Sequence, residues 1–402
     1  MVEKGLTDFF EGYLEKNFLF KDRKILQSSY MPENISYREN EIKQIAGILA
    51  PSLRTEKPSN IFIYGKTGTG KTLSIKYIVR NMLEIAKKKN VNLKIVYLNC
   101  KLRRIADTEY RLIAQLTREF GGEVPATGLP TDEVYKSFLR YLDDKKFLLI
   151  IVLDEIDQLI NKIGDEILYN LTRLNSELIN SEISLVGISN DLVFADNLDP
   201  RVKSSLSEEE VVFSPYNAVQ LQKILKERAD LAFKENVVDD GVIEKCSAYA
   251  AKEHGDARRA LELLRIAGEL AERENKDRVT LEFVDNAEAK IERDKIVDVV
   301  NLQPKQFKIT LYSILEICLK GNKCVFTGDI YELYKDICFK TNERPLTQRR
   351  ISDIIAELDM LGIVNAKVIS KGRYGRTREI CLAIPNSVAL KINLILKEGL
   401  GL

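Results

Sequence analysis

A glycine-rich segment that ends in lysine and threonine carries the clearest chemistry of this 402-residue chain. It matches the pattern GxxxxGK[ST], and its residues are Gly65, Lys66, Thr67, Gly68, Thr69, Gly70, Lys71 and Thr72. Backbone N–H groups of such a loop surround phosphate oxygens, the lysine charge faces the β and γ phosphates, and the threonine hydroxyl binds Mg²⁺. An apolar run, 61–64, precedes the segment and a helical pattern follows it. The segment therefore predicts a site for ATP or ADP with Mg²⁺; the alternative is an ordinary glycine-rich turn.

Two adjacent carboxylates follow the longest apolar run of the chain. The run 147–153 predicts a buried strand, and Asp154 and Glu155 stand at its C-terminal end, where α/β proteins bind their ligands. Asp154 is suited to hold Mg²⁺ together with Thr72, and Glu155 is suited to polarise an attacking water. The alternative is that these acids only cap the next helix, which is also a sufficient explanation of Asp157.

A second group of residues with binding chemistry lies near the C-terminus. Between 347 and 361 one buried helical stripe is predicted, formed by Ile351, Ile354, Ile355, Leu358 and Leu361. The same pattern leaves polar side chains at the start of this helix, which are Gln348, Arg349, Arg350 and Ser352. Because Arg and Gln have the donor geometry that reads base edges in the major groove, we interpret this segment as a recognition helix.

Two strand-like runs follow, 363–369 and 379–384, with a glycine-rich turn between them. No acid occurs between 367 and 378, and the turn and its flank carry Lys371, Arg373, Tyr374, Arg376 and Arg378. A hairpin tip of this composition suits a phosphate backbone or a minor groove. Three helical segments followed by a hairpin is the order of a winged helix. We expect it to bind DNA, and the alternative is a protein partner.

The charge of the chain is unevenly distributed. Residues 301–402 carry 16 Lys and Arg against 10 Asp and Glu, a balance of +6, whereas residues 1–300 carry 45 against 50. A basic module attached to a near-neutral body is typical of a protein that binds a phosphate backbone, although inert domains reach the same charge.

The elements that position these groups follow from the hydrophobic pattern. Strands are predicted at 61–64, 93–99, 147–153, 183–189 and 211–213, separated by amphipathic stretches, which indicates a parallel α/β sheet. Four helical segments are predicted between 217 and 293. We therefore expect an N-terminal arm over 1–30, a nucleotide-binding domain over 31–213, a helical lid over 214–300 and a winged helix over 301–402.

Composition excludes several classes of protein. With 45% hydrophobic and 30% charged residues the chain is neither disordered nor fibrous. The six cysteines form no CxxC pair and there is one histidine, so no zinc site is recognisable; we expect reduced, mostly buried thiols. No apolar run approaches the ~20 residues of a membrane span, and the N-terminus lacks a signal pattern. We expect a cytoplasmic, nucleoid-associated protein.

These motifs resemble those of the AAA+ ATPases, and nearly the whole chain resembles the archaeal replication initiators similar to origin recognition complex subunit one and cell division control protein six. The resemblance rests on the glycine-rich loop, on the segment 154–157 and on 188–190, 198–205 and 255–259. It implies that Asn190 orients the attacking water, that Arg201 acts on the nucleotide of a neighbouring subunit, and that Arg258 reaches phosphate from this chain's own lid. Arg259 is the alternative to Arg258, and a surface ion pair is the alternative for Arg201.

The resemblance also implies where the base and part of the DNA bind. The segment 30–39, from Tyr30-Met31-Pro32 through Tyr37-Arg38-Glu39, is similar to the one that cradles adenine in the family, and Tyr216 and Arg228 are placed to complete that pocket. Hinge packing for Tyr216 and a solvated helix face for Arg228 are the alternatives. The family's DNA-touching insert matches 101–108, with Arg103 and Arg104, and a solvated loop is the alternative there.

The function implied by the resemblance is that of a slowly hydrolysing ATPase that works as a switch. It would bind double-stranded origin DNA through the winged helix and the insert, and help to load the replicative helicase, alone or with paralogous initiator subunits. Two rival functions stay open. One is a winged-helix transcriptional regulator that uses nucleotide only as a ligand, and the other is a clamp-loader-type ATPase, although the Ser-Arg-Cys finger motif of such subunits is absent here.

Overall fold

The computed structural model describes residues 18–101, 108–125, 128–144, 146–206, 208–320, 324–370 and 376–402. The chain divides into two compact units, one ending at Asp285 and the other formed by Asn286–Leu402. The division falls within one long helix, α13 (Leu281–Asn301). Each unit is described separately.

The first unit is built on a five-stranded parallel sheet with the order β2-β3-β4-β1-β5. The strands are β1 (Ile61–Tyr64), β2 (Leu93–Asn99), β3 (Leu148–Asp154), β4 (Glu182–Ser189) and β5 (Glu209–Val212). The five predicted strands are confirmed, with small shifts at their ends. Tyr64 is paired with Ser189, and Asp154 with Ile188, so β1, β3 and β4 end at the same edge.

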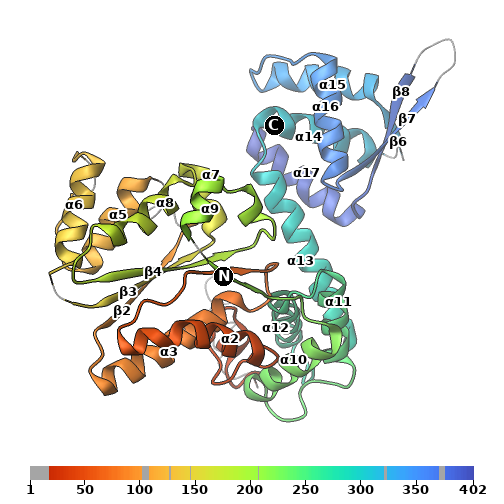
Figure 1. Ribbon diagram of the computed structural model, residues 1–402. Helices are drawn as coiled ribbons and strands as arrows, with labels where there is room; N and C mark the ends of the chain where they lie inside the picture. Colours follow the sequence, from red (N-terminus) through yellow and green to blue (C-terminus); the bar gives the residue numbers. More distant parts are fainter. Residues whose placement is uncertain are drawn as a thin grey trace, which may run out of the picture. The chain divides into compact units, whose positions relative to one another are not determined.

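Helices cover both faces of this sheet (Figure 1). On one face α2 (Glu39–Leu49) and α3 (Lys71–Lys89) bury apolar residues such as Ile45 and Ile75 against β1, β3 and β4. The other face is covered by α5 (Glu109–Glu119), α6 (Thr131–Leu142), α7 (Ile156–Ile163), α8 (Glu166–Arg173) and α9 (Pro200–Leu206). All seven residues of β3 are buried, as the continuous apolar run predicts for a central strand of a parallel sheet.

Helices replace strands after β5, as predicted. They are α10 (Ala218–Ala232), α11 (Val242–Lys252), α12 (Ala257–Arg273) and α13. Short 3₁₀ turns occur at η1 (Arg23–Leu26), η2 (Ala50–Arg54), η3 (Leu174–Ser176) and η4 (Phe194–Asn197). The α/β core with a helical lid therefore agrees with the expected architecture.

The first described residues of the chain are anchored on the lid. The Phe20 ring stacks on the Phe233 ring with 4.4 Å between their centroids. The buried carboxylate of Glu272 accepts the backbone N–H of Leu19 at 2.8 Å and pairs with Arg23. This anchor fixes one end of the segment 27–36, which then crosses from the lid to the core.

The second unit has the element order of a winged helix. After α13 come α14 (Lys305–Leu319), β6 (Cys324–Phe326), α15 (Thr327–Lys340), α16 (Gln348–Met360), β7 (Val364–Ser370), β8 (Arg376–Leu382) and α17 (Asn386–Leu400). The strands form an antiparallel sheet with the order β6-β8-β7. The three helices and the hairpin are confirmed. The sequence interpretation missed β6, which has only three residues, and the final helix α17.

Two details of the second unit correct the predictions. Leu361 is 43% exposed and does not extend the buried stripe, because α16 ends at Met360 and Gly362 turns the chain with φ +69°. The expectation of reduced cysteines is wrong for one pair, since Cys324 and Cys381 form a disulfide between β6 and β8. They face each other across the ladder although 57 positions separate them in sequence. The other four cysteines are free, and three of them are buried.

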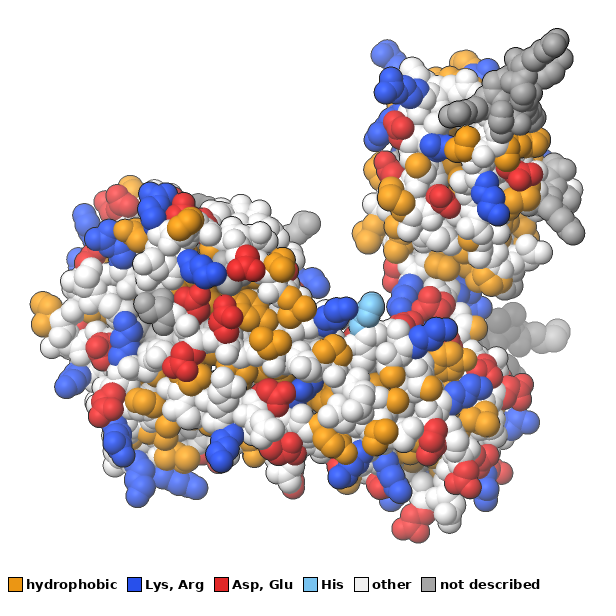
Figure 2. Space-filling model, turned by 45° about the vertical axis from the view of Figure 1, so that its right-hand side comes forward, with side chains coloured by type: hydrophobic (Ala, Val, Ile, Leu, Met, Phe, Trp, Pro, Cys, Tyr) orange, Lys and Arg blue, Asp and Glu red, His pale blue; other side chains and the backbone are white. Residues whose placement is uncertain are grey.

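Among the described residues no helix has the length and apolarity of a membrane span. On the face shown in Figure 2, basic and acidic side chains are interspersed over the α/β core, without a large area of one sign. The charge of this core therefore offers no extended basic surface on that face.

Candidate functional site

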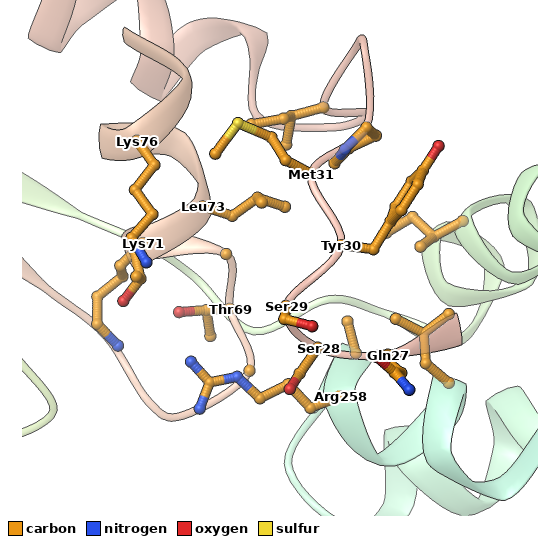
Figure 3. A pocket seen from close by; sticks show the side chains of 18 of the residues that line it. Gln27, Ser28, Ser29, Tyr30, Met31, Thr69, Lys71, Leu73, Lys76 and Arg258 are labelled. Carbon is orange, nitrogen blue, oxygen red and sulfur yellow. The ribbon is translucent and has the colours of Figure 1, made fainter. Parts of the chain in front are cut away.

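A pocket of about 550 Å³ lies between the α/β core and the helical lid of the first unit. It is lined by the segment 27–36, by the loop between β1 and α3, by the ends of β3 and β4, and by lid residues from α10 and α12. Figure 3 shows Lys71 and Arg258 toward one end of the pocket and Tyr30 and Met31 toward the other. A cationic end and an aromatic end in one cavity match the two ends of a nucleotide.

The glycine-rich loop forms the cationic end. Thr67 to Thr72 line the pocket, while the carbonyls of Gly65 and Lys66 turn inward to accept the Lys71 ammonium at 2.5 and 2.8 Å. Gly68 has a φ of +72°, and a Cβ there would lie 1.7 Å from the Asp256 carboxylate of the lid. Glycine is therefore required here both by backbone conformation and by the closeness of the lid.

Lys71 is buried and surrounded by oxygen acceptors. Its Nζ also donates to Asn190 Oδ1 at 3.0 Å, which links the loop to the end of β4. Burial, assisted by the nearby Arg258 charge, lowers the pKa of Lys71 to about 8. The ammonium is thus held by neutral carbonyl and amide groups that a phosphate can replace.

Asp154 and Thr72 bring two oxygen donors together. Thr72 Oγ1 donates to Asp154 Oδ2 at 3.0 Å, and Asp154 is 4% exposed. Adjacent hydroxyl and carboxylate oxygens are the ligand type that Mg²⁺ prefers, so the residues fit this ion. The next residue, Glu155, has a left-handed φ of 57°. This backbone conformation is unfavourable for a residue other than glycine, and such strained conformations are concentrated at functional sites. Its carboxylate also lines the pocket, 3.9 Å from Lys101 Nζ.

Asn190 and Asp157 are connected at the end of β4. Asp157 Oδ1 accepts the Ser189 hydroxyl at 3.2 Å and the Asn190 N–H at 3.4 Å. Asp157 does not line the pocket, whereas Asn190 does. Asp157 was predicted to be only a helix-capping or structural acid. The geometry supports a structural role, because the Asp157 carboxylate fixes the backbone that carries Asn190.

The start of α12 brings a lid arginine to the loop. Asp256 caps the helix by accepting the N–H groups of Arg258 and Arg259, and the Ala257 N–H donates to the Gly68 carbonyl at 3.2 Å. Arg258 lines the pocket, as Figure 3 shows, whereas Arg259 is buried and its guanidinium pairs with Glu253 at 3.4 Å. Of the two arginines, Arg258 is the one that faces the cavity.

The aromatic end of the pocket holds Tyr30 and Arg228, whereas Tyr216 lines the pocket next to the glycine-rich loop, where a Cβ at Gly70 would lie 2.8 Å from its hydroxyl oxygen. Arg228 is buried, its guanidinium lies 4.5 Å from the centroid of the Tyr30 ring, and it donates to the Ile25 carbonyl at 3.3 Å. Tyr216 is buried at the start of the lid, and burial raises the pKa of its hydroxyl. The solvated helix face considered for Arg228 is therefore excluded, and Tyr216 both lines the cavity and packs at the hinge.

Arg38 lies in the segment 30–39, which the resemblance assigns to the adenine cradle, but the prediction gave it no role of its own. It is 4% exposed, and it donates from Nε to the Thr69 carbonyl at 2.9 Å and from Nη2 to the Ser214 carbonyl. Its guanidinium also lies 4.1 Å from the centroid of the Tyr216 ring. One buried arginine thus ties the glycine-rich loop to the hinge of the lid.

Arg201 is placed away from this pocket. It lies in the first turn of α9, its side chain is 85% exposed, and its guanidinium pairs with the neighbouring Asp199 at 3.1 Å. Most predicted nucleotide residues of this unit line one pocket, namely Thr67 to Thr72, Asp154, Glu155, Asn190, Tyr216, Arg228 and Arg258. Arg201 faces solvent in the single chain, and Gly65, Lys66 and residues 37–39 are not among the lining residues.

In the second unit the start of α16 is polar and open to solvent. Gln348, Arg349 and Arg350 are exposed, and the Thr347 side chain caps the helix by accepting the Arg350 N–H. Ser352 is half-buried, and its carbonyl accepts Arg378 Nη1 at 2.6 Å, so Arg378 fastens β8 to the helix. Several predicted DNA residues lie outside the described residues, namely Arg103, Arg104, Lys371, Arg373 and Tyr374, and for Arg376 only the backbone is described.

Comparison with known protein families covers most of the chain. Residues 54–192 match an AAA domain, 222–289 match the Cdc6 AAA+ ATPase-type lid domain, and 298–391 match the CDC6 C-terminal winged helix domain. The chain is 52% identical over 388 residues to an ORC1-type DNA replication protein of Thermococcus onnurineus, covering 96% of this chain and 93% of that protein. The chain belongs to this ORC1-type family.

A second relative and a solved structure support the same family. An ORC1-type DNA replication protein of Pyrococcus furiosus is 50% identical over 396 residues, covering 98% of this chain and 93% of that protein. The structure of the Aeropyrum pernix ORC1 protein in complex with DNA matches with a TM-score of 0.78 and 45% identity, covering 95% of this chain and 98% of that chain. The predicted resemblance and fold class of this ORC1-type chain are confirmed.

Proposed function

We propose that this ORC1-type protein is an ATP-dependent replication initiator that binds double-stranded origin DNA. The observation that carries the proposal is the combination, on one chain, of a phosphate pocket closed by its own lid and a winged helix whose recognition helix begins with exposed Gln348, Arg349 and Arg350. The related ORC1 structure from Aeropyrum pernix contains DNA, which supports the same ligand here. A clamp-loader subunit would end in a helical collar instead of this winged helix.

The pocket residues have distinct roles in this proposal. Lys71 and Arg258 bind the phosphates, and Thr72 and Asp154 would hold Mg²⁺, which would supply positive charge beside the transferred phosphoryl group. Glu155 takes the proton of the attacking water, which Asn190 orients. Tyr30, Tyr216 and Arg228 bind the base end. The glycine-rich loop contacts the first turn of α12 through Gly68, so a nucleotide bound here sets the angle between core and lid. ATP and ADP are distinguished because each sets a different angle.

The DNA contacts are divided between the recognition helix and the wing. Arg349 and Gln348 contact base edges in the major groove. The contacts to phosphates and to the minor groove are made by the turn and by the core insert, through Lys371, Arg373, Tyr374, Arg376, Arg103 and Arg104. Arg378, which is bonded to the Ser352 carbonyl, holds the wing against the helix. The protein bound to DNA in this way helps to load the replicative helicase. Paralogous initiator subunits are its partners in this step.

Fluorescence anisotropy on duplex DNA tests this proposal. The full chain is titrated onto its own replication origin and onto scrambled duplexes, across salt concentrations, with ATP and with ADP. We expect tighter binding to the origin, a difference between the two nucleotides, and weaker binding by Arg349→Ala. Loss of one phosphate contact reduces the salt slope by about one unit, whereas loss of a base contact costs about 1–3 kcal/mol of selectivity.

Lys397→Ala is the matched control, because it removes an exposed positive charge from α17 of the same unit. It should leave origin selectivity unchanged. Binding that ignores sequence, or no binding at all, would contradict the proposal and favour an ATPase that acts on protein partners.

A further inference from the structure

Tyr97 contacts the metal-site carboxylate from a strand outside the glycine-rich loop. It lies on β2, the edge strand next to β3, and its hydroxyl donates to Asp154 Oδ2. The ladder pairs Tyr97 with Val152 and Asn99 with Asp154, so the tyrosine stands two positions before the partner of Asp154, within reach of its side chain. No motif of the sequence includes this residue.

The Asp154 carboxylate is held by three donors from three places. Oδ2 accepts Thr72 Oγ1 at 3.0 Å as well as Tyr97, and Oδ1 accepts the Glu155 N–H at 3.0 Å. The terminal torsion of aspartate has a broad energy minimum, so the plane of a carboxylate is fixed mainly by its hydrogen bonds. Among these donors Tyr97 is the one that belongs neither to the loop nor to the turn after β3.

Each carboxylate oxygen offers about two acceptor sites, and those of Oδ2 are filled by Thr72 and Tyr97. When the Thr72 hydroxyl turns toward a metal, one site becomes available while Tyr97 still holds the other. The carboxylate then keeps its orientation although one of its bonds has been exchanged. Loss of Tyr97 would leave Oδ2 without a protein donor in that state.

The surroundings keep Tyr97 in place as a donor. Its ring packs against the core cluster that contains Ile150 and Val152, and Lys76 Nζ lies 4.8 Å from the ring centroid. The ring is thereby held between this core cluster and the Lys76 ammonium, with its hydroxyl directed at Asp154 Oδ2. A donor held in this way is what a positioning role requires.

We propose that Tyr97 is a positioning residue that orients the Asp154 carboxylate for Mg²⁺ bound with the nucleotide. The inference rests on the proposed nucleotide and metal site. Mutation of a residue that is hydrogen-bonded to a metal ligand typically lowers the affinity for the metal by 10- to 100-fold. Tyr97→Phe removes the hydroxyl and keeps the ring, so it isolates the hydrogen bond from the packing.

The test measures binding of a fluorescent ATP analogue to the full chain over a Mg²⁺ titration and in EDTA. For Tyr97→Phe we expect the Mg²⁺ concentration at half-effect to rise about tenfold or more, and the affinity in EDTA to stay within about twofold of the parent protein. A normal Mg²⁺ titration, or an equal loss with and without Mg²⁺, would overturn the inference, the latter because it indicates a general structural role.

Two further variants separate the possible failures. Tyr135→Phe is the matched control, since its hydroxyl donates to the Glu109 carboxylate at 2.6 Å in the same unit, and it should leave the Mg²⁺ titration unchanged. Asp154→Asn should abolish the Mg²⁺ effect. If Asp154→Asn weakens it and Tyr97→Phe does not, only the role of Tyr97 is wrong; if neither changes it, the proposed metal site is wrong as well.

Discussion

At the scale of single residues, Lys71 shows how the fold adapts a common side chain to one task. A solvated lysine keeps its proton well above neutral pH, but burial and the neighbouring Arg258 charge bring the pKa of Lys71 to about 8. The cost of burying the ammonium is offset by three oxygen acceptors, Gly65 O, Lys66 O and Asn190 Oδ1. In the free protein the lysine is therefore charged near neutral pH and loses its proton at moderately alkaline pH.

This pKa predicts a pH dependence of nucleotide affinity. Phosphate requires the charged ammonium, so affinity for ATP should be nearly constant below pH 7 and should fall as the pH rises through 8, by up to about tenfold per pH unit. Isothermal titration calorimetry between pH 6.5 and 9.5 measures it. Lys71→Arg keeps its charge over this range, so its weaker binding should be flat with pH; a parallel decline in that variant would assign the effect to another group.

At the scale of elements, a disulfide and a side-chain hydrogen bond join β8 of the wing to two neighbouring elements. The Cys324–Cys381 disulfide joins β8 to β6, and Arg378 joins β8 to the carbonyl of Ser352 on α16. Both attachments are on β8, the central strand of its three-stranded sheet. Strand β8 is thereby fixed to both the sheet and α16.

The disulfide predicts a stability that depends on reductant. It closes a loop of 57 positions, and removal of such a bridge by Cys381→Ser should cost about 2–4 kcal/mol of unfolding free energy in this unit. Urea titration with hydrogen exchange of peptides covering β6 and β8 measures it. A reductant should bring the parent protein to the level of the variant, and Cys318→Ser, a free cysteine of the same unit, should respond to reductant as the parent does. Identical protection with and without reductant would contradict the bridge.

At the scale of the whole molecule, Arg201 is a predicted catalytic residue that does not line the pocket of its own chain. Its side chain is 85% exposed and its ion pair with Asp199 is solvated, so releasing it costs little. The pocket of the same chain is lined without it. These observations support the prediction that Arg201 acts on the nucleotide of a neighbouring copy.

A role in a neighbouring copy predicts that the effect of Arg201→Ala on ATP turnover depends on protein concentration. Arg201→Ala should lower ATP turnover only where chains assemble, at high protein concentration or on DNA, by an amount that reaches the order of 10³-fold for an arginine of this kind. Glu155→Gln should keep nucleotide binding and stop turnover at every concentration. Turnover per chain is followed by phosphate release over a dilution series, and an equal loss for Arg201→Ala at the highest dilution would place its action within the single chain.

The sequence by itself determined the features that depend on neighbouring residues. The loop 65–72 is recognisable because its glycines and lysine act through local backbone conformation, and β3 because a strand buried on both faces must be continuously apolar. The order of three helices and a hairpin likewise follows from local periodicity. From these features came the α/β core, the lid, the winged helix and most of the pocket.

Only the tertiary structure decided the contacts between distant positions. Arg38 meets the Ser214 carbonyl 176 positions away, and Tyr97 meets Asp154 57 positions away. Arg258 rather than Arg259 faces the pocket because Asp256 fixes where α12 begins. Which residues meet depends on strand register and on how lid and core pack, and periodicity within one segment carries no information about either.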